Sequence, residues 1–173
     1  MKDNRKKLAL VIIILFFGMS ISPSIIGIGG TDSSFEGDIT IVSIQPSSQT
    51  VEKGETFTVS IYVELDDPIV GVAFDHLYFD PDLIRANSVT EGNLFNNYLM
   101  FSDGDIDNEN GVITDVYIIT EKAKDKTGTL VNIEFTAQQK LGISDLNLEG
   151  IAVINGDNKR LILEVNDGIV TVQ

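Results

Sequence analysis

The sequence predicts an all-β fold, an antiparallel β-sandwich in which two sheets pack face to face. From Ile39 onward, short stretches alternate apolar and polar residues, and turn-forming residues separate them at near-regular intervals. After the N-terminal segment, no 3.6-residue apolar period lasts longer than a turn or two, so helices between the strands are not expected. The roughly 135 residues that begin at Ile39 are enough for one core of this kind.

The N-terminal residues predict export. Residues 2–7 are rich in lysine and arginine, and residues 8–17 are an unbroken run of ten apolar side chains, as in a signal peptide. The apolar stretch continues weakly to Ile28, long enough for an uncleaved anchor, although Pro23 and nearby glycines favour cleavage. We expect residues 1–28 to be a signal peptide or N-terminal anchor. The mature protein would then be secreted, or held at the cell surface through this segment.

Residues 29–38 are small and polar and predict a flexible lead-in, so the folded domain is expected at residues 39–173. Residues 56–65 and 130–137 show the strand alternation most clearly. Their expected core side chains are Phe57, Val59, Ile61, Val63, Val131, Ile133 and Phe135. Further strands are expected at residues 39–45, 70–80, 83–91, 98–103, 112–120, 143–154 and 161–172. Turn residues lie between them at 46–48, 53–54, 66–68, 80–82, 110–111, 155–156 and 167–168.

The composition excludes several classes of function. The chain has no cysteine, so it has no disulfide, thiolate metal site or cysteine nucleophile, and His76 is its single histidine. Residues 1–30 carry a net charge of +3, so the remaining chain carries −17, from 25 acidic and 8 basic side chains. A domain this acidic repels nucleic-acid phosphates and anionic membrane surfaces. We therefore expect no nucleic-acid partner, and a membrane contact only through the N-terminal segment if it is retained.

The densest cluster of metal-ligand oxygens is Asp103, Asp105 and Asp107, in the stretch S-D-G-D-I-D-N-E-N-G. The D-x-D-x-D spacing resembles the start of a calcium loop, because alternate carboxylates can point at one cation. The glycine and glutamate that an EF-hand needs at its sixth and twelfth positions are Asn108 and Thr114 here. An acidic hairpin loop is favoured, with a calcium site as the alternative, and no cofactor is expected.

The sequence offers little for catalysis. His76 follows Asp75 in an expected strand, where neighbours point to opposite faces and would not meet. No G-x-S-x-G nucleophile motif occurs. The chain has no tryptophan and only four tyrosines, which disfavours glycoside hydrolysis and the stacking of sugars on flat rings. We expect a binding domain that is not an enzyme, with a carbohydrate-binding module or surface-adhesion domain as the alternative.

The ordered succession of several segments resembles the cohesin domains, and the archaeal-type members in particular. Residues 70–84 read V-G-V-A-F-D-H-L-Y-F-D-P-D-L-I, an amphipathic strand that ends in aromatic-Asp-Pro and is followed by an apolar pair. Further similar segments are V-E-K-G-E-T-F-T-V (51–59), N-S-V-T-E-G-N-L-F (87–95), I-D-N-E-N-G-V-I-T-D-V (106–116), G-T-L-V-N-I-E-F-T-A (128–137) and V-N-D-G-I-V-T-V (165–172). The resemblance covers residues 39–172.

This resemblance implies a nine-stranded jelly-roll without catalytic residues, whose exposed sheet binds a dockerin. A dockerin is a calcium-loaded helical module of a partner protein, often a polysaccharide-degrading enzyme, so calcium is expected on the partner. A polysaccharide is an alternative partner, because carbohydrate-binding modules share the superfamily.

The family's contact strand matches the strand at residues 70–80. The resemblance matches the family's contact positions to Val72 and Phe74 and a glutamate of its pattern to Glu121, and alternation continues this face to His76 and Tyr78. If the neighbouring strands share the sheet, Phe101 and Tyr117 join these residues in one partner-binding patch, with Glu121 at its rim. The segment A-F-D-H-L-Y-F-D-P is one residue longer than the family pattern, which indicates a bulge near Asp75 and His76. Such a bulge could instead turn Phe74 into the core, so both orientations of Phe74 remain open.

Overall fold

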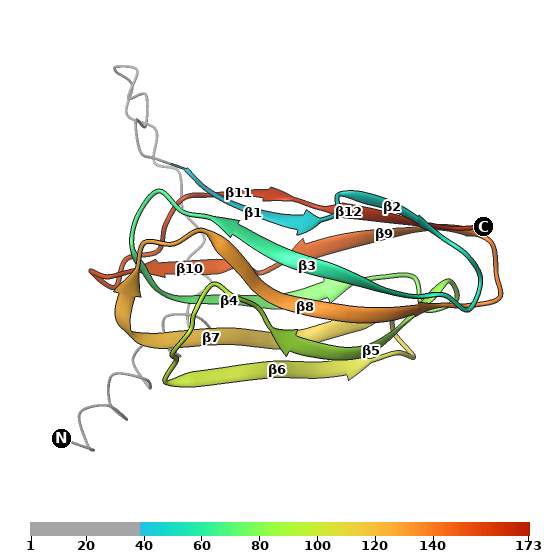
Figure 1. Ribbon diagram of the computed structural model, residues 1–173, viewed down its shortest axis with the longest axis horizontal. Helices are drawn as coiled ribbons and strands as arrows, with labels where there is room; N and C mark the ends of the chain where they lie inside the picture. The colour runs from blue at the N-terminus through green and yellow to red at the C-terminus, as the bar shows by residue number, and fades with distance from the viewer. Residues whose placement is uncertain (1–38) are drawn as a thin grey trace, which may run out of the picture. The chain divides into compact units, whose positions relative to one another are not determined.

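Twelve strands in two sheets make up residues 39–173, the part of the chain that the computed structural model describes (Figure 1). The five-stranded sheet has the order β11 (Leu163–Asn166), β1 (Thr40–Gln45), β3 (Thr56–Glu64), β8 (Gly128–Ala137) and β5 (Ile84–Glu91). The seven-stranded sheet has the order β2 (Ser48–Val51), β12 (Gly168–Val172), β9 (Gly142–Glu149), β4 (Ile69–Tyr78), β7 (Val112–Lys124) and β6 (Met100–Asp107), with β10 (Ala152–Asn155) also paired to β4.

The strand pairs are antiparallel except for two parallel pairs at the margins, β1 with β11 and β12 with β2. Within residues 39–173 no helix is present that could cross a bilayer. The expected signal peptide and the flexible lead-in, residues 1–28 and 29–38, lie outside the described residues.

The all-β sandwich predicted from the sequence is confirmed, and each expected strand has a counterpart in the structure. The strand expected at 143–154 is divided into β9 and β10 at Gly150, and the one expected at 161–172 into β11 and β12. The expected loop at residues 103–110 is largely wrong, because β6 continues to Asp107. No strand was expected where β2 lies, and Val51 is the single apolar residue of that strand.

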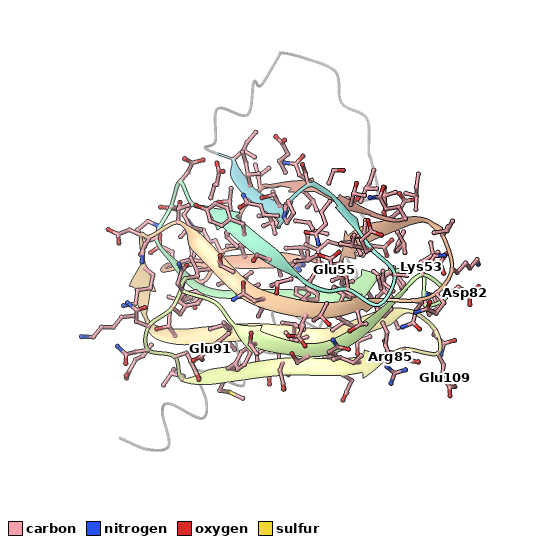
Figure 2. The ribbon with its side chains drawn as sticks, turned by 45° about the vertical axis from the view of Figure 1, so that its right-hand side comes forward. Lys53, Glu55, Asp82, Arg85, Glu91 and Glu109 are labelled. Atoms are coloured by element: carbon pink, nitrogen blue, oxygen red, sulfur yellow. The ribbon has the colours of Figure 1, made fainter. Side chains whose placement is uncertain are left out.

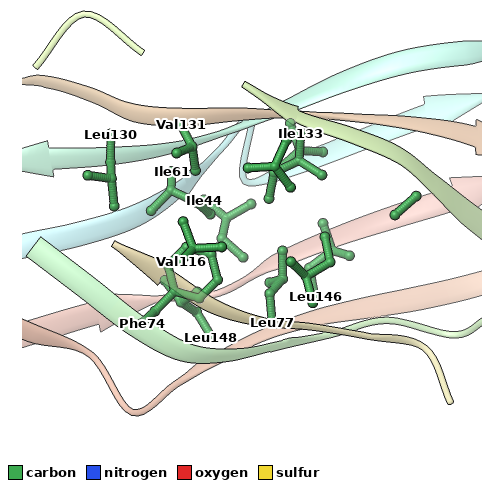
Figure 3. Close-up of a cluster of buried hydrophobic side chains, with 14 of the residues drawn as sticks. Ile44, Ile61, Phe74, Leu77, Val116, Leu130, Val131, Ile133, Leu146 and Leu148 are labelled. Atoms are coloured by element: carbon green, nitrogen blue, oxygen red, sulfur yellow. The ribbon is translucent and has the colours of Figure 1, made fainter. Parts of the chain in front are cut away.

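The core fills the space between the two sheets with aliphatic and aromatic side chains. Phe135 stacks against Phe57 at 5.7 Å between ring centroids and meets Phe79 edge-on at 5.4 Å. Figure 3 shows side chains of both sheets meeting in this layer, among them Ile44, Ile61, Leu130, Val131, Ile133, Phe74, Leu77, Val116, Leu146 and Leu148. Charged side chains lie outside it, as Arg85, Glu91 and Glu109 do in Figure 2.

Four neighbouring positions of the seven-stranded sheet interrupt the strand alternation at one level. At each of these positions the paired residues before and after it on neighbouring strands have the same register. The four residues are Gly104 of β6, Asp115 of β7, Asp75 of β4 and Gly150, which follows β9. We call these four residues the transverse row. Gly104, Asp115 and Gly150 have left-handed backbone, with φ of 74°, 58° and 68°.

The transverse row adds one residue to each strand between successive core positions. On β4 the core side chains on either side of the row are Phe74 and Leu77, and on β7 they are Val116 and Ile113. Two residues separate each pair, where regular alternation would place one. Because β6, β7, β4 and the segment between β9 and β10 carry the extra residue at the same level, their hydrogen-bonded register is kept while the residues that face outward change.

The row depends on glycine where the chain has no room for a side chain. A Cβ on Gly104 would collide with the carbonyl oxygen of Thr114, and a Cβ on Gly150 would collide with the side chain of Asp75. Both positions also have the positive φ that costs other residues free energy.

Replacing Gly104 with alanine is expected to destabilise the domain by about 1–3 kcal/mol more than replacing Gly54. Both glycines have a similar left-handed backbone, with φ of 74° and 77°, but at Gly54 the nearest atom to a new Cβ would be Gln139 Nε2 at 3.8 Å. Urea unfolding of the two variants measures the difference. Equal losses of stability would show that the transverse row tolerates a side chain.

Candidate functional site

The candidate site is the outer face of β9, β4, β7 and β6 on one side of the transverse row. At its centre the rings of His76 and Tyr78, two positions apart on β4, stack at 5.4 Å with an interplanar angle of 5°. His76 lies between Glu149 of β9 and Thr114 of β7 in the sheet register. Tyr78 lies between Asn147 and Val112 and is 37% exposed. The stack therefore presents a flat ring surface to solvent, flanked by polar side chains.

Acidic side chains border this ring surface. Glu149 of β9 is paired with His76, Asp75 of β4 interacts electrostatically with Asp115 of β7, and Asp105 of β6 is paired with Thr114. Burial raises the pKa of the Asp75 carboxyl; the charge of His76 opposes this, Asp115 adds to it, and Arg160 opposes it. The face is therefore predominantly anionic, with His76 and Arg160 as its basic neighbours.

The expectation that Asp75 and His76 point to opposite faces is wrong. Phe74 and Leu77 both face the core, so the two residues between them both lie off the core and are half-buried. The extra residue of the transverse row is the physical reason, since strict alternation would have separated them. A carboxylate and an imidazole thus share one side of the sheet.

Three residues of the predicted patch are wrongly placed. Val72 and Phe74 are 0% and 1% exposed and belong to the core, because they lie on the other side of the transverse row from His76. Phe101 is paired with Ile118, at the level where β7 faces the core, and it packs against the core cluster. The inward orientation of Phe74, which the bulge had left open, is therefore the observed one. Counting alternation through an inserted residue reverses the face.

The other predicted contact residues lie beyond the transverse row. Tyr117 is paired with Ala73, on the side of the sheet that faces away from the core, and is half-buried. Glu121 is exposed further along β7, where it lines an open pocket of 260 Å³ together with Tyr98, Lys122 and Lys124. His76 and Tyr78 are thus brought together by the fold, whereas Glu121 belongs to a separate feature.

On that side of the row, Tyr117 is half-buried, and several other residues opposite the core are small or apolar and fully buried. Ala73, Ile119, Ala152 and Ile154 are each 2% exposed or less. The accessible part of this outer face is therefore the half that contains His76 and Tyr78.

The calcium alternative fails on the geometry of β6. Asp103 is paired with Val116, at a level that faces the core, whereas Asp105 and Asp107 are paired with Thr114 and Val112 on the other side of the row. The three carboxylates therefore do not converge. Over residues 39–173, no group of three or more histidine, aspartate or glutamate side chains is arranged to hold a metal ion.

Asp107 instead closes the hairpin turn between β6 and β7. Its carboxylate accepts hydrogen bonds from the Asn110 side chain at 2.7 Å and from the backbone N–H groups of Asn110 and Glu109 at 3.0 and 2.9 Å. These hydrogen bonds, the side-chain one first, lower the pKa of the Asp107 carboxyl. The turn is thus an Asx-type turn rather than a metal loop.

The outer face of the five-stranded sheet has a different character. Its polar side chains form hydrogen bonds with one another. Ser60 Oγ donates a hydrogen bond to Asn132 Oδ1 at 2.7 Å, and Asn87 Nδ2 donates one to Thr136 Oγ1 at 2.9 Å. Groups that already have partners gain less from binding another molecule. The face with His76 and Tyr78 is therefore the better candidate, and it contains two of the contact residues predicted from the sequence.

Comparison with known proteins gives a consistent family. The sequence model of the family described as Cohesin domain matches residues 42–172 of this chain. No match was found among the curated proteins.

Solved structures with the same fold include several from bacteria and one from an archaeon. A chain of the Coh-OlpA–Doc918 type I cohesin–dockerin complex from Clostridium thermocellum has a TM-score of 0.68 at 18% identity, covering 79% of this chain and 100% of that one. The non-cellulosomal cohesin of Archaeoglobus fulgidus has a TM-score of 0.63 at 18% identity, covering 79% and 92%. A chain of the C. thermocellum Coh-OlpC–Doc435 complex has a TM-score of 0.67 at 14% identity, covering 83% and 99%.

Replacing Phe74 or Tyr78 of β4 with alanine is expected to change the free energy of unfolding by different amounts, because one ring is in the core and the other is at the surface. Phe74→Ala should lower the free energy of unfolding by about 3–5 kcal/mol, because it leaves a cavity among buried side chains. Tyr78→Ala should lower it by less than about 1 kcal/mol, since that ring is 37% exposed. Chemical denaturation monitored by circular dichroism measures both. Similar losses would contradict the assignment of the two faces.

Replacing Asp75 with asparagine is expected to stabilise the domain at pH 7. A raised pKa means that the folded state binds the proton more tightly than the unfolded state, so ionisation of Asp75 costs stability as the pH rises. The advantage of the asparagine variant should shrink as the pH falls through the raised folded-state pKa and be lost below about 4, the ordinary aspartate pKa. Unfolding curves at pH 3 and pH 7 measure it.

Asp107→Asn is the matched control, with the opposite sign. The lowered pKa of Asp107 contributes stability above the ordinary aspartate pKa, and this contribution is lost as the pH falls through the folded-state value. The variant should therefore be less stable than the wild type at pH 7 and approach it in acid. If both variants shift stability in the same direction at pH 7, the environment assigned to Asp75 is incorrect.

Proposed function

The chain belongs to the cohesin domain family, and from this premise we propose that residues 39–173 bind a dockerin through the outer face of β9, β4, β7 and β6. Cohesin domains are interaction modules without catalytic activity, and several structures that share this fold are cohesin–dockerin complexes. The observation that carries the proposal is the accessible His76–Tyr78 stack, set among carboxylates on the outer side of this sheet.

The physical role of each part of the face follows from its chemistry. Tyr78 offers a large, partly exposed ring with few torsions, which is the type of side chain that anchors protein interfaces. Glu149 is paired with His76, and Asp75 adjoins His76 with Asp115 near it, so the stack has negative charge on the His76 side. Such a charge distribution speeds the encounter with a basic partner and fixes its orientation more than it adds affinity. The dockerin is therefore expected to present lysine or arginine side chains to this face.

The cellular setting is part of the same proposal. The N-terminal residues have the composition of a signal peptide or anchor, which supports export and action outside the cell or at its surface. The calcium of the complex is assigned to the dockerin, and a polysaccharide-degrading enzyme is the candidate bearer of that dockerin. Gel analysis and N-terminal sequencing of the native protein, in medium and in cell fractions, would distinguish a cleaved form from a retained one.

Tyr78→Ala is expected to weaken dockerin binding by about 2 kcal/mol, roughly thirtyfold, with little loss of stability. The measurement is calorimetric titration with purified, calcium-loaded dockerin modules encoded in the same genome. Tyr62→Ala, on the five-stranded sheet, is the matched control and should bind like the wild type. A glycan array run in parallel tests the alternative ligand. Tight glycan binding without any bound dockerin would overturn the proposed function.

A further inference from the structure

A pocket of 260 Å³ lies at the end of the sandwich where β6 begins and β7 ends. The segment before β6 forms one wall and the last residues of β7 form the other. We call it the Tyr98 pocket; its lining includes Asn97, Tyr98, Thr120, Glu121, Lys122 and Lys124. On β7, Thr120 is six positions from Thr114, the partner of His76, which is about 20 Å at 3.3 Å per residue. The pocket is therefore separate from the His76–Tyr78 stack.

A wide bulge in β7 makes room for this pocket. Between the last two pairs that join β4 to this end of β7, β4 has one residue, Val70, whereas β7 has four, residues 120–123. Extra residues of this kind bend the strand and redirect its side chains, and bulges are common beside binding sites. The bulge thus supplies Glu121 and Lys122 to the pocket wall.

Hydrogen bonds join the two walls, so the pocket is formed before any ligand binds. The backbone N–H of Leu99 donates to the carbonyl oxygen of Ile119 at 2.7 Å. The hydroxyl of Thr120, a buried side chain, donates to the carbonyl oxygen of Asn97 at 3.1 Å. Pre-formed walls of this kind are typical of small-molecule sites.

The Tyr98 ring is the one aromatic surface among the lining side chains, and it is held in place on two sides. Its hydroxyl shares a hydrogen bond with the Glu91 side chain, and its ring contacts that of Phe101 at 5.9 Å between centroids. The ring is nevertheless 43% exposed. A fixed, open ring can stack against a ligand with little further loss of side-chain freedom.

The polar lining decides which class of ligand fits. The ammonium groups of Lys122 and Lys124 only donate hydrogen bonds, whereas the carboxylate of Glu121 only accepts them. A cationic ligand would be repelled by the lysines, and an anionic one by the carboxylate and by the strongly acidic domain. A neutral ligand rich in hydroxyl groups can use both kinds of partner. Sugar rings combine such hydroxyl groups with a C–H face that can lie on an aromatic ring.

We propose that the Tyr98 pocket binds one ring of a neutral polysaccharide, stacked on Tyr98 and hydrogen-bonded by the polar side chains of β7. This inference goes beyond the proposed function and does not depend on it. The volume of 260 Å³ is below the about 300–1,000 Å³ of pockets for drug-sized ligands, so it suits one sugar ring. The scarcity of aromatic residues, which disfavours an extended sugar platform, does not prevent a site of this size.

So few contacts predict weak binding, with a Kd on the order of 1 mM for one ring. Weak sites become effective when the ligand presents many copies, as a polysaccharide does. The pocket would then hold the domain near a polysaccharide while the docking face remains open to a protein partner.

The test titrates the wild-type domain with short neutral oligosaccharides of hexoses and of pentoses, followed through backbone amide signals by NMR. The signals of residues 97–99 and 120–124 are expected to shift. Tyr98→Ala should bind the same sugar at least about tenfold more weakly, because it removes the flat ring. Tyr98→Leu keeps apolar bulk without that ring, should show the same loss, and serves if the alanine variant does not fold. Tyr62→Ala, on the five-stranded sheet, is the matched control and should bind like the wild type.

Several results would overturn the inference. The pocket signals could stay unchanged with every neutral sugar at millimolar concentration, or both Tyr98 variants could bind the sugar like the wild type. Tighter binding of a uronic acid oligomer than of the neutral sugars would make the ligand an anion. Calorimetry with dockerin separates this inference from the proposed function, because Tyr98→Ala should bind dockerin like the wild type. If it does not, the pocket belongs to the docking face. A wild type that binds sugar in the pocket but no dockerin would support the inference and overturn the proposed function.

Discussion

Ladder hydrogen bonding ties the strands of the seven-stranded sheet to one another, and this constraint governs its outer face. A single strand that gains a residue must bulge or lose register with its neighbours. Here β6, β7, β4 and the β9–β10 line change facing at the same level, at Gly104, Asp115, Asp75 and Gly150, so the register on either side is unchanged. The inserted level supplies outward side chains without interrupting the core, where Phe74, Leu77, Val116 and Ile113 stay packed.

The same arrangement explains which parts of the structure can be predicted from the sequence. Alternation identifies β3 and β8 because their inward residues, such as Val59 and Ile133, follow the two-residue period throughout the contact with the core. On β4 the two-residue period is interrupted at Asp75 and His76. If inward and outward positions are counted from one end of the strand, the residues at the other end are therefore assigned to the wrong face. The bulge near Asp75 was indicated by a segment that is one residue longer than the family pattern. The extension of the bulge to the neighbouring strands β6, β7 and β9 depends on pairing between residues that are distant in the sequence, and no short stretch of sequence contains this information.

Glycine was the available signal for this wider feature. Gly150 interrupts the strand expected at residues 143–154, and Gly104 directly follows the one expected at 98–103. Glycine inside a strand often marks a bulge or a close approach of the backbone. Asp115 gave no comparable signal, although aspartate tolerates left-handed backbone better than most residues. Asp75 shows the cost of the arrangement, because a partly buried carboxyl lies beside another acid where a neutral residue would suit the folded state better. Groups of this kind occur where binding, rather than stability, governs the choice of residue.

The parallel pairing of β1 with β11 and of β12 with β2 has a mechanical consequence. Figure 1 shows β1 beginning toward one end of the sandwich and β12 finishing at the other. A pulling force applied between these two points acts along the strands, and each of the two strands is held by ladders on both sides. Hydrogen bonds that run across the strands are then loaded together in shear, instead of one after another as in unzipping. A domain with this geometry can transmit tension between whatever is attached at its two ends while its core stays closed.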